Sequence, residues 1–582
     1  MRECGVLMPV FSLPSAYGIG CFSKEAYEFV DMLKKSGQTK WQILPLGPTG
    51  YGDSPYQSFS TFAGNPYFID PETLIKEGLL TKKECEESMP AVKDKPVRND
   101  KRQDERASDE TVEEETADVR IADEIVDAAI SSEAETADEA VDAEAAMSPI
   151  DYEWLYFHRF PLLRKAFSRF KPDAAYEKFL TENEDWLTDY CLFMAIKDKQ
   201  GGISFAEWSD AYRNREPEAM EEAKAALKTE MDFYRFQQYE FRKQWDKLHA
   251  YANAQGIEII GDIPIYVAFD SADTWANPKL FQIGEDNLPT GVAGCPPDAF
   301  SATGQLWGNP LFAWDYHKKT GYEWWLKRIA HCFSLYDVVR IDHFRGFDEY
   351  YAIPYGDKTA EFGKWMPGPG MDLFRTVKEK LGDLPIIAED LGFLTESVKE
   401  LLKDSGYPGM KVLQFAFDPR EPSNYLPHTY TPNSVAYTGT HDNTTTRGWY
   451  HEISAESRAF AREYMRIPAL DEDTLSWNFI ALAMSSVANL CMIPMQDYLC
   501  LDKEARINTP STLGGNWTWR MEKGAFTEEL ANQMKRLTVI YGRSRKEEGK
   551  EESKEEHKVE SKEERKVESR EERKEERKDL QE

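Results

Sequence analysis

Short apolar segments that lead to an acidic residue recur six times along this chain. In Asp337–Phe347 (DVVRIDHFRGF), a β-branched run carries Arg340 and stops at Asp342. A short apolar run with turn-forming residues at its ends is typical of a buried strand. A structural ion pair would explain one such acid, because a buried charge needs a partner. The other segments, with their acids, are 257–264 (Asp262), 384–392 (Glu389 and Asp390), 411–418 (Asp418), 434–443 (Asp442) and 491–497 (Asp497).

Helix-like segments separate most of these strands, an alternation that favours a parallel sheet. Gly5–Pro9 and Trp41–Pro48 predict two further strands, with a helix over Ser23–Ser36 between them. Acids at the C-terminal ends of many parallel strands are typical of the catalytic face of a (β/α)8 barrel. We therefore predict an α/β fold, namely a TIM barrel with large inserted, mostly helical subdomains.

Charge and composition exclude several classes of function. The net charge of −32 argues against a nucleic-acid partner, because phosphate binding needs a basic surface. The eight cysteines lack metal-ligand spacing, so we expect no metal site and mostly buried, reduced thiols. The chain has neither a signal-like apolar start nor a run of about 20 apolar residues, which predicts a cytoplasmic protein without a membrane span.

Changes in composition suggest how the chain is divided. Residues 91–150 hold 7 Lys and Arg against 19 Asp and Glu, with no aromatic residue, which predicts disorder. This segment is either a solvated spacer or an interaction segment. The predicted division is 1–84 (start of the barrel), 85–150 (acidic insertion), 151–255 (helical subdomain), 256–542 (remainder of the barrel) and 543–582 (Glu/Lys/Arg tail, disordered or an isolated helix).

Two long loops follow predicted barrel strands. Thr49–Asn65 is rich in glycine, serine and aromatic residues, and Gly294–Pro310 (GCPPDAFSATGQLWGNP) lies in a longer loop over Phe269–Pro310. Loops after barrel strands carry binding and catalytic residues more often than not. Tyr56 in the first loop could stack on a sugar, or it could anchor the loop.

Several motifs together resemble the 4-α-glucanotransferases, also called amylomaltases or disproportionating enzymes, of glycoside hydrolase family 77 in the α-amylase clan. Three of them are RIDHFRGF (Arg340–Phe347), AEDLG (Ala388–Gly392) and GTHDN (Gly439–Asn443). The others are Pro45–Gln57, Gly261–Pro278, the Gly294–Pro310 loop and NWTWR at Asn516–Arg520. The resemblance extends to about Gly542, interrupted by the acidic insertion.

This resemblance implies roles for three carboxylates. Asp342 matches the family nucleophile, Glu389 the general acid/base, and Asp442 the carboxylate that grips sugar hydroxyls and stabilises the transition state. Retention at a glycosidic carbon needs two carboxyls about 5–5.5 Å apart, which neighbouring strand ends can supply. The charge of Arg340 is expected to keep Asp342 ionised. Strand alternation points Asp390, the competing acid, to the other side.

The resemblance also implies a set of glucan-contacting residues, for which packing or loop anchoring is the alternative. These are Tyr56, Asp262, Gln305, Trp307, Arg340, Asp418, His441 and Asn508. It implies no cofactor, α-1,4-glucans and maltooligosaccharides as donor and acceptor, and no obligate protein partner. The runner-up functions are an α-glucan hydrolase and a catalytically silent glucan-binding relative.

Overall fold

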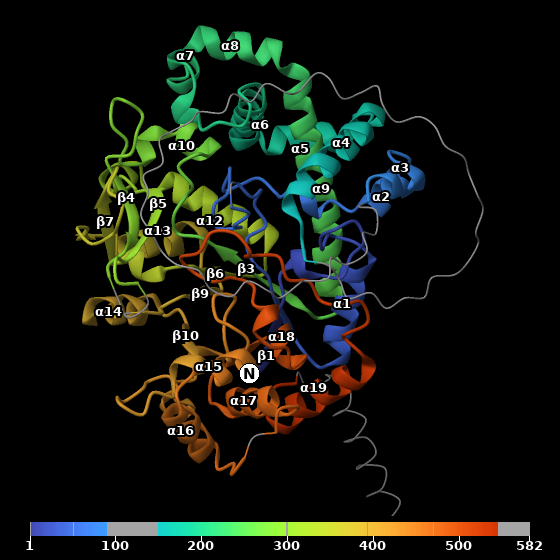
Figure 1. Cartoon of the computed structure of the whole chain (residues 1–582). Helices are drawn as coiled ribbons and strands as arrows, with labels where there is room; N and C mark the ends of the chain where they lie inside the picture. The colour runs from blue at the N-terminus through green and yellow to red at the C-terminus, as the bar shows by residue number, and fades with distance from the viewer. Residues whose placement is uncertain are drawn as a thin grey trace, which may run out of the picture. The chain divides into compact units, whose positions relative to one another are not determined.

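The structure is a computed structural model of the chain, shown in Figure 1. It describes residues 2–50, 52–89, 149–297, 301–392, 394–469 and 471–544. Most of the predicted acidic insertion (85–150) and charged tail (543–582) lies in 90–148 and 545–582, outside the described residues. Helix α3 (Lys82–Glu87) runs past residue 84, and its Cys85 is buried.

Eight parallel strands close into a barrel, which confirms the predicted fold class. Each strand pairs with the next barrel strand along the chain, and the last strand pairs with the first. All eight correspond to predicted strand segments. The strands are β1 (Glu3–Leu7), β2 (Lys40–Gln42), β3 (Glu258–Ile263), β6 (Val338–Ile341), β9 (Ile386–Ala388), β10 (Gly409–Val412), β11 (Ser434–Tyr437) and β12 (Leu490–Pro494).

Strands β10, β11 and β12 end before the acids predicted to close them, and β11 stops at Tyr437, short of Asp442. β10 stops at Val412 and the chain turns into a 3-10 helix over Leu413–Phe415, so Asp418 does not end a strand. Asp497 lies in the short helix α18 (Met495–Tyr498), where its carboxylate accepts hydrogen bonds from Thr438 and Thr446. Strand length is set by pairing with neighbours, which an apolar run alone does not specify.

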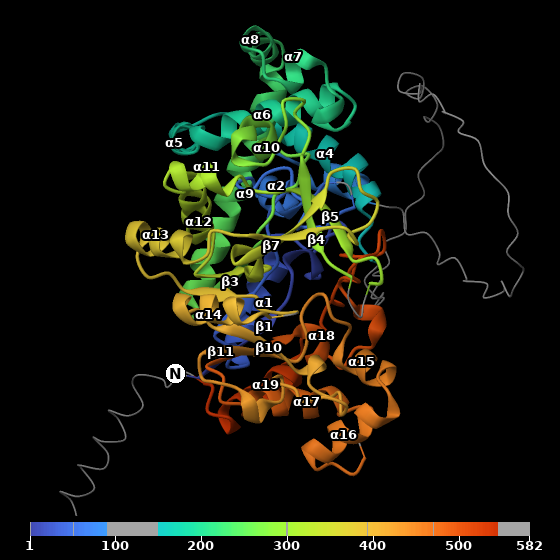
Figure 2. The ribbon, with the colours of Figure 1, turned by 90° about the vertical axis from the view of Figure 1, so that its left-hand side faces the viewer.

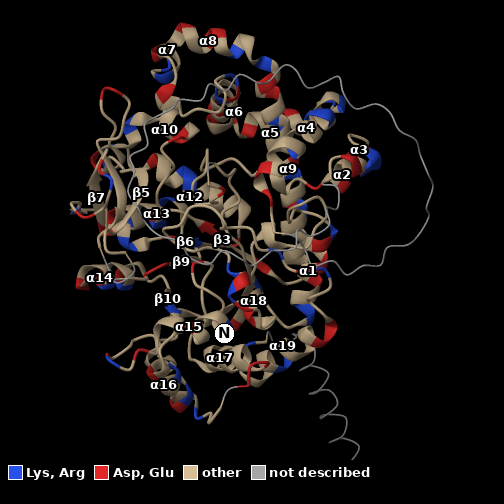
Figure 3. Cartoon of the chain, in the orientation of Figure 1, with Lys and Arg blue, Asp and Glu red and all other residues tan. Residues whose placement is uncertain are grey.

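Amphipathic helices cover the barrel. In α1 (Lys24–Lys35), Phe29 and Leu33 face the core, and Gly37 takes the left-handed conformation after the helix ends. Figure 3 shows acidic and basic residues interspersed on outer helices. The remaining helices outside the segment 151–255 are α2 (Pro71–Lys76), α10 (Ala272–Ala276), α11 (Trp314–Lys319), α12 (Glu323–Leu335), α13 (Met371–Leu381), α14 (Glu396–Ser405), α15 (Thr446–Glu452), α16 (Ala455–Met465), α17 (Leu475–Ser485) and α19 (Glu528–Ile540).

One helical segment is divided into two helices. The segment Trp314–Leu335 forms α11 and α12 because Gly321 and Tyr322 between them adopt left-handed backbone angles. A helix does not continue through such a pair. Among the described residues, no helix combines the length and apolar character needed to cross a membrane.

The segment 151–255 is helical, and its last helix belongs to two cores. Trp245 and Leu248 of α9 pack in the barrel core, while Met231 and Tyr234 pack in a separate apolar cluster with α6. Figures 1 and 2 place α6, α7 and α8 on one side of the barrel strands and α16 and α17 on the other. These helices are α4 (Tyr152–Arg169), α5 (Ala174–Glu182), α6 (Glu184–Lys199), α7 (Asp210–Arg213), α8 (Pro217–Ala226) and α9 (Lys228–Ala254).

A second, antiparallel sheet takes two of its strands from the predicted loop Phe269–Pro310. Its order is β5-β4-β7-β8, and β4, β5 and β7 are labelled in Figure 2. Glycines and prolines hide these strands in the sequence, yet Gly294 is needed, because a Cβ there would lie 2.2 Å from the Gln305 carbonyl oxygen. The strands are β4 (Gly291–Cys295), β5 (Gln305–Pro310), β7 (Glu349–Pro354) and β8 (Lys364–Pro367).

Candidate active site at the C-terminal ends of the barrel strands

Two of the predicted catalytic carboxylates leave the barrel side by side. Ile341 at the end of β6 pairs with Ala388 at the end of β9, and Asp342 and Glu389 are the next residues. Neighbouring strands lie about 4.8 Å apart, so this register brings the two side chains close together. Asp342 is held from the other neighbour, since its backbone N–H donates to the Ile263 carbonyl at 3.0 Å.

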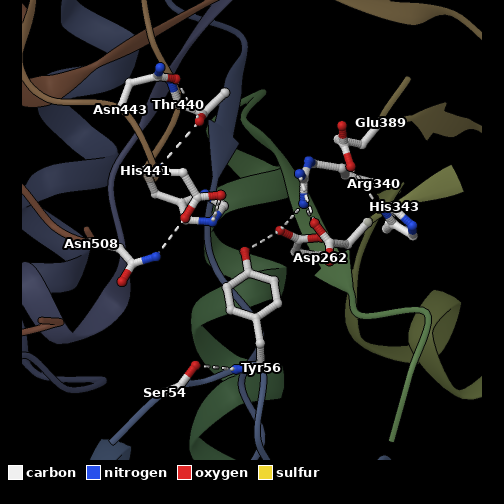
Figure 4. Close-up of polar contacts among 12 residues, drawn as sticks. Ser54, Tyr56, Asp262, Arg340, His343, Glu389, Thr440, His441, Asn443 and Asn508 are labelled. Atoms are coloured by element: carbon white, nitrogen blue, oxygen red, sulfur yellow. Dashed lines mark hydrogen bonds and ion pairs between the residues drawn. The ribbon is translucent and has the colours of Figure 1, made fainter. Parts of the chain in front are cut away.

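A buried ion pair lies beneath these carboxylates. Asp262 on β3 pairs in register with Arg340 on β6, and the guanidinium donates to both carboxylate oxygens at 2.8 and 2.6 Å. A second guanidinium nitrogen of Arg340 lies 3.0 Å from Asp342 Oδ1. Figure 4 shows Arg340 reaching Asp262 between the two strands. One arginine therefore serves two carboxylates.

Because Arg340 is shared with Asp262, the expected ionisation of Asp342 changes. Burial raises the pKa of its carboxyl well above the usual range, with Asp262, Glu389 and Asp442 adding to the effect, although Arg340 lowers it. The prediction that Arg340 keeps Asp342 ionised considered only the effect of Arg340, which lowers the pKa of Asp342. Much of the guanidinium charge is already balanced by the two hydrogen bonds to Asp262, which leaves less for Asp342.

Glu389 is oriented by two backbone groups. Its Oε2 accepts the His343 N–H at 2.7 Å, and its Oε1 accepts the Leu391 N–H at 2.8 Å. Burial raises the pKa of Glu389, against the lowering influence of Arg340 and these N–H groups. Asp390 points elsewhere, as predicted, since its carboxylate accepts the Met410 N–H on β10 at 2.6 Å. Glu389 is thus the acid of this pair that lines the cleft.

Asp442 is held by the segment that carries Asn508. The Asn508 amide donates to Asp442 Oδ1 at 2.6 Å, and Arg506 donates to the backbone carbonyls of both residues at 2.7 and 2.6 Å. His441 Nε2 lies 3.3 Å from Asp442 Oδ2, and burial lowers the pKa of His441. A neutral imidazole beside a carboxylate can bond sugar hydroxyls as donor or acceptor.

Tyr56 links the two sides of the site. Its hydroxyl donates to Asp262 Oδ2 at 2.7 Å, and its ring stacks on His441 with centroids 5.2 Å apart. Figure 4 shows Tyr56 between Asp262 and His441. The residue therefore acts as a structural anchor, and it also lines the cleft.

The side chains converge on a cleft with about 710 Å³ of space, within the range of about 300–1,000 Å³ that is usual for ligand sites. Trp307 on β5 stands edge-on to His343, with centroids 4.9 Å apart, and its Nε1–H donates to Gln305. Asp262 and Arg340 are buried below. The predicted residues that line the cleft are Tyr56, Gln305, Trp307, Asp342, Glu389, His441, Asp442 and Asn508.

The structure does not bring Asp418 to this cleft. Arg420 lies two residues further along the chain and donates from two nitrogens to both oxygens of the Asp418 carboxylate. This pairing lowers the pKa of Asp418 to about 2. Asp418 is also absent from the residues that line the cleft.

Three residues of the site were not singled out from the sequence. His343 has a left-handed backbone (φ 49°), which aims its N–H at Glu389, and burial lowers the pKa of its imidazole to about 4. Tyr266 lies beside Trp307, and Arg506 holds Asp442. His343 lies within the RIDHFRGF motif, whereas no sequence signal marks Arg506.

Metal-ligating clusters are not found among the described residues, since no three histidine, cysteine, aspartate or glutamate side chains there are arranged to hold an ion. Arg340, together with backbone N–H groups, provides the positive charge and hydrogen-bond donors next to Asp342 and Glu389. The arrangement suits acid/base and nucleophilic chemistry at a carbon flanked by two carboxyls.

Comparisons with known proteins agree on one family. The family model described as 4-alpha-glucanotransferase, glycoside hydrolase family 77, matches residues 8–527. The 4-alpha-glucanotransferase of Clostridium butyricum is 47% identical over 540 residues, which cover 92% of this chain and 100% of that protein. That of Thermus thermophilus is 41% identical, covering 92% and 98%.

Solved structures give the same picture. The amylomaltase from Streptococcus agalactiae, solved in complex with acarbose, is 40% identical and superposes with a TM-score of 0.81. The match covers 94% of this chain and 100% of that one. The amylomaltase from Corynebacterium glutamicum, at 16% identity and a TM-score of 0.70, shares the fold.

Proposed function

Because the chain belongs to the 4-alpha-glucanotransferases of glycoside hydrolase family 77, we propose that it transfers α-1,4-glucan segments by a retaining double displacement with Asp342 as nucleophile. Glu389 is the acid/base and Asp442 the transition-state stabiliser. The observation that carries the assignment is that Asp342 and Glu389 leave paired strands side by side into a cleft that Asp442 also lines.

The first step breaks the donor bond. Asp342 attacks the anomeric carbon while Glu389 gives its proton to the glycosidic oxygen, and the reducing-end fragment departs. The raised pKa of Glu389 favours the protonated form that this step needs. Asp442, fixed by Asn508, holds sugar hydroxyls as the ring flattens.

The second step makes the new bond. Glu389, now a carboxylate, takes the proton of the acceptor 4-hydroxyl, whose oxygen attacks the anomeric carbon and releases Asp342. The backbone N–H groups of His343 and Leu391 keep the Glu389 carboxylate in place between the two steps. An acceptor glucose or maltooligosaccharide must therefore reach the same cleft.

Transfer competes with hydrolysis at the glycosyl-enzyme, so the cleft must place a sugar hydroxyl better than water. Trp307, edge-on to His343, is the large apolar side chain next to the catalytic carboxylates on the wall formed by β5. We propose that it excludes water. Trp307→Ala is expected to raise the ratio of hydrolysis to transfer, and an unchanged ratio would remove this role.

Incubation with maltotriose, with products resolved by size, tests the function. Glucose together with maltopentaose and longer chains is the result expected for glucan transfer. Glucose and maltose alone would instead support an α-glucan hydrolase. No product from maltotriose or from longer donors would support a silent glucan-binding relative. Asp342→Asn and Glu389→Gln should each lower kcat by about a thousandfold or more if they hold the proposed roles.

A further inference from the structure

Two amide side chains on the cleft wall, Gln57 and Asn309, bind each other reciprocally. We propose that this pair, the amide clasp, positions Tyr56 and Trp307 and thereby sets how the glycosyl-enzyme divides between a sugar acceptor and water. The inference rests on the proposed transfer function and concerns residues that act through others.

The two amides of the clasp bond each other, and one of them also bonds the backbone. Gln57 Nε2 donates to Asn309 Oδ1 at 3.0 Å, and Asn309 Nδ2 donates to Gln57 Oε1 at 3.4 Å. The same Asn309 Nδ2 also donates to the Val267 carbonyl at 2.9 Å. The Asn309 residue is only 4% exposed, so each lost partner leaves a buried polar atom unpaired.

The clasp joins three segments, one in the loop after barrel strand β2 and two in the stretch between barrel strands β3 and β6. Gln57 lies in a tight turn after β2, where the backbone N–H of Gly50 donates to the Gln57 carbonyl at 3.1 Å. Val267 follows β3, and Asn309 lies in β5 of the second sheet. These loops are held to one another by this pair of side chains, and Gln57 and Asn309 both line the cleft.

The neighbours of the clasp contact residues that lie next to the proposed catalytic carboxylates. Tyr56 precedes Gln57 in the chain and bonds Asp262 while it stacks on His441. Trp307 lies two residues before Asn309 in β5, and Gly308 between them has a left-handed backbone (φ 77°). Trp307 meets His343, whose N–H holds Glu389.

A loosened clasp should therefore act on two sides of the site. Tyr56 and Trp307 would keep their contacts but sample more positions, and a misplacement of about 1 Å is enough to affect a reaction that depends on orientation. An acceptor sugar needs a defined site, whereas a water molecule does not. Loss of the clasp is thus expected to slow transfer more than hydrolysis.

The experiment compares Asn309→Ala, Gln57→Ala and the double variant on maltotriose. Transfer conserves the number of reducing ends and hydrolysis adds one, so new reducing ends per glucose released measure the partition. Each single variant is expected to raise this ratio by about tenfold, with the double variant no higher than the larger single effect. The ratio does not depend on how much enzyme is folded.

Gln244→Ala is the matched control. Gln244 is a buried amide on α9 that accepts the Asp70 N–H at 2.7 Å, and it does not line the cleft. It should lower the unfolding midpoint without changing the partition. Single variants that keep the wild-type ratio, or a double variant whose effect is the product of the two, would overturn the clasp. A wild-type enzyme that only hydrolyses would instead overturn the proposed function.

Discussion

Two aspartates from predicted strand segments, Asp262 and Asp418, each pair with an arginine. One pair is buried and the other is exposed. Asp262 and Arg340 are both 3% exposed, and their pairing joins strands β3 and β6. Asp418 and Arg420 lie two residues apart in an exposed turn. The first pair lies under the proposed catalytic carboxylates, and the second is outside the cleft.

This contrast shows that the role of a strand-end carboxylate depends on the arginine with which it pairs, and not on the acidic residue alone. Arg340 comes from a neighbouring strand and is buried, and its guanidinium also lies within ion-pair distance of Asp342. Arg420 is a local partner in water, where ion pairs contribute little because solvent screens them. Buried charges depend on their partners far more strongly.

Removing the buried arginine should have the largest effect. Arg340→Met leaves Asp262 buried without a counter-charge and Asp342 without its cation, so we expect a loss of about 3–5 kcal/mol in unfolding free energy and of nearly all transfer activity. Urea unfolding and the maltotriose assay measure both. Arg420→Met is the matched control, with no measurable change in midpoint. Equal effects of the two variants would erase the distinction between the pairs.

Neutralising the shared partner should move the pH profile. Asp262→Asn leaves more of the Arg340 charge to Asp342, which lowers the raised pKa of Asp342. The nucleophile works in its ionised form, so activity is present above this pKa and is lost as the pH falls through it. The acid limb of kcat/KM should therefore shift down by about one pH unit. An unmoved or upward-shifted limb would show that Asp262 does not compete for Arg340.

A smaller effect is expected from the other hydrogen-bond partner of Asp262, Tyr56. Tyr56→Phe removes the hydroxyl that donates to Asp262 and keeps the ring that stacks on His441. One hydrogen bond of this kind contributes about 1 kcal/mol, so kcat/KM should fall about three- to tenfold. Kinetics on maltotriose measure this change. A loss as large as that of Arg340→Met would mean that the Tyr56 hydroxyl matters as much for activity as the buried Asp262–Arg340 ion pair.

The exposed pair should give the smallest effect. Asp418→Asn is expected to leave both the unfolding midpoint and kcat on maltotriose unchanged. Longer maltooligosaccharides sharpen the test, because the family resemblance implies that Asp418 contacts glucan. A higher KM for long donors alone would mean that the Asp418–Arg420 pair opens to bind substrate.

Local pattern was enough to predict the barrel but not the second sheet. The eight barrel strands are apolar runs with acids or turn residues after them, and burial on both faces makes such runs continuous. β4 and β5 contain glycine and proline instead of an alternating pattern, so Gly294–Pro310 was predicted as a loop. Only close backbone packing, as at Gly294, reveals why these residues form strands.

The residues of the candidate site also fall into two groups, those that sequence motifs identify and those that only the folded structure identifies. Asp342, Glu389 and Asp442 could be named from motifs, and the structure brings all three to one cleft. Arg506 could not, because its role is to bond backbone carbonyls of a segment 64 residues away in sequence. The left-handed backbone of His343 is likewise a property of the folded loop.

The sequence by itself determined the strand segments, the acids at their ends and the family to which they belong, because these depend on residue type and order along the chain. The sharing of the Arg340 charge between Asp262 and Asp342, and the raised pKa that burial gives Asp342, arise only in the folded structure. The physical reason is that electrostatic energies in a water-poor site depend on three-dimensional distance and burial, which the order of residues does not contain.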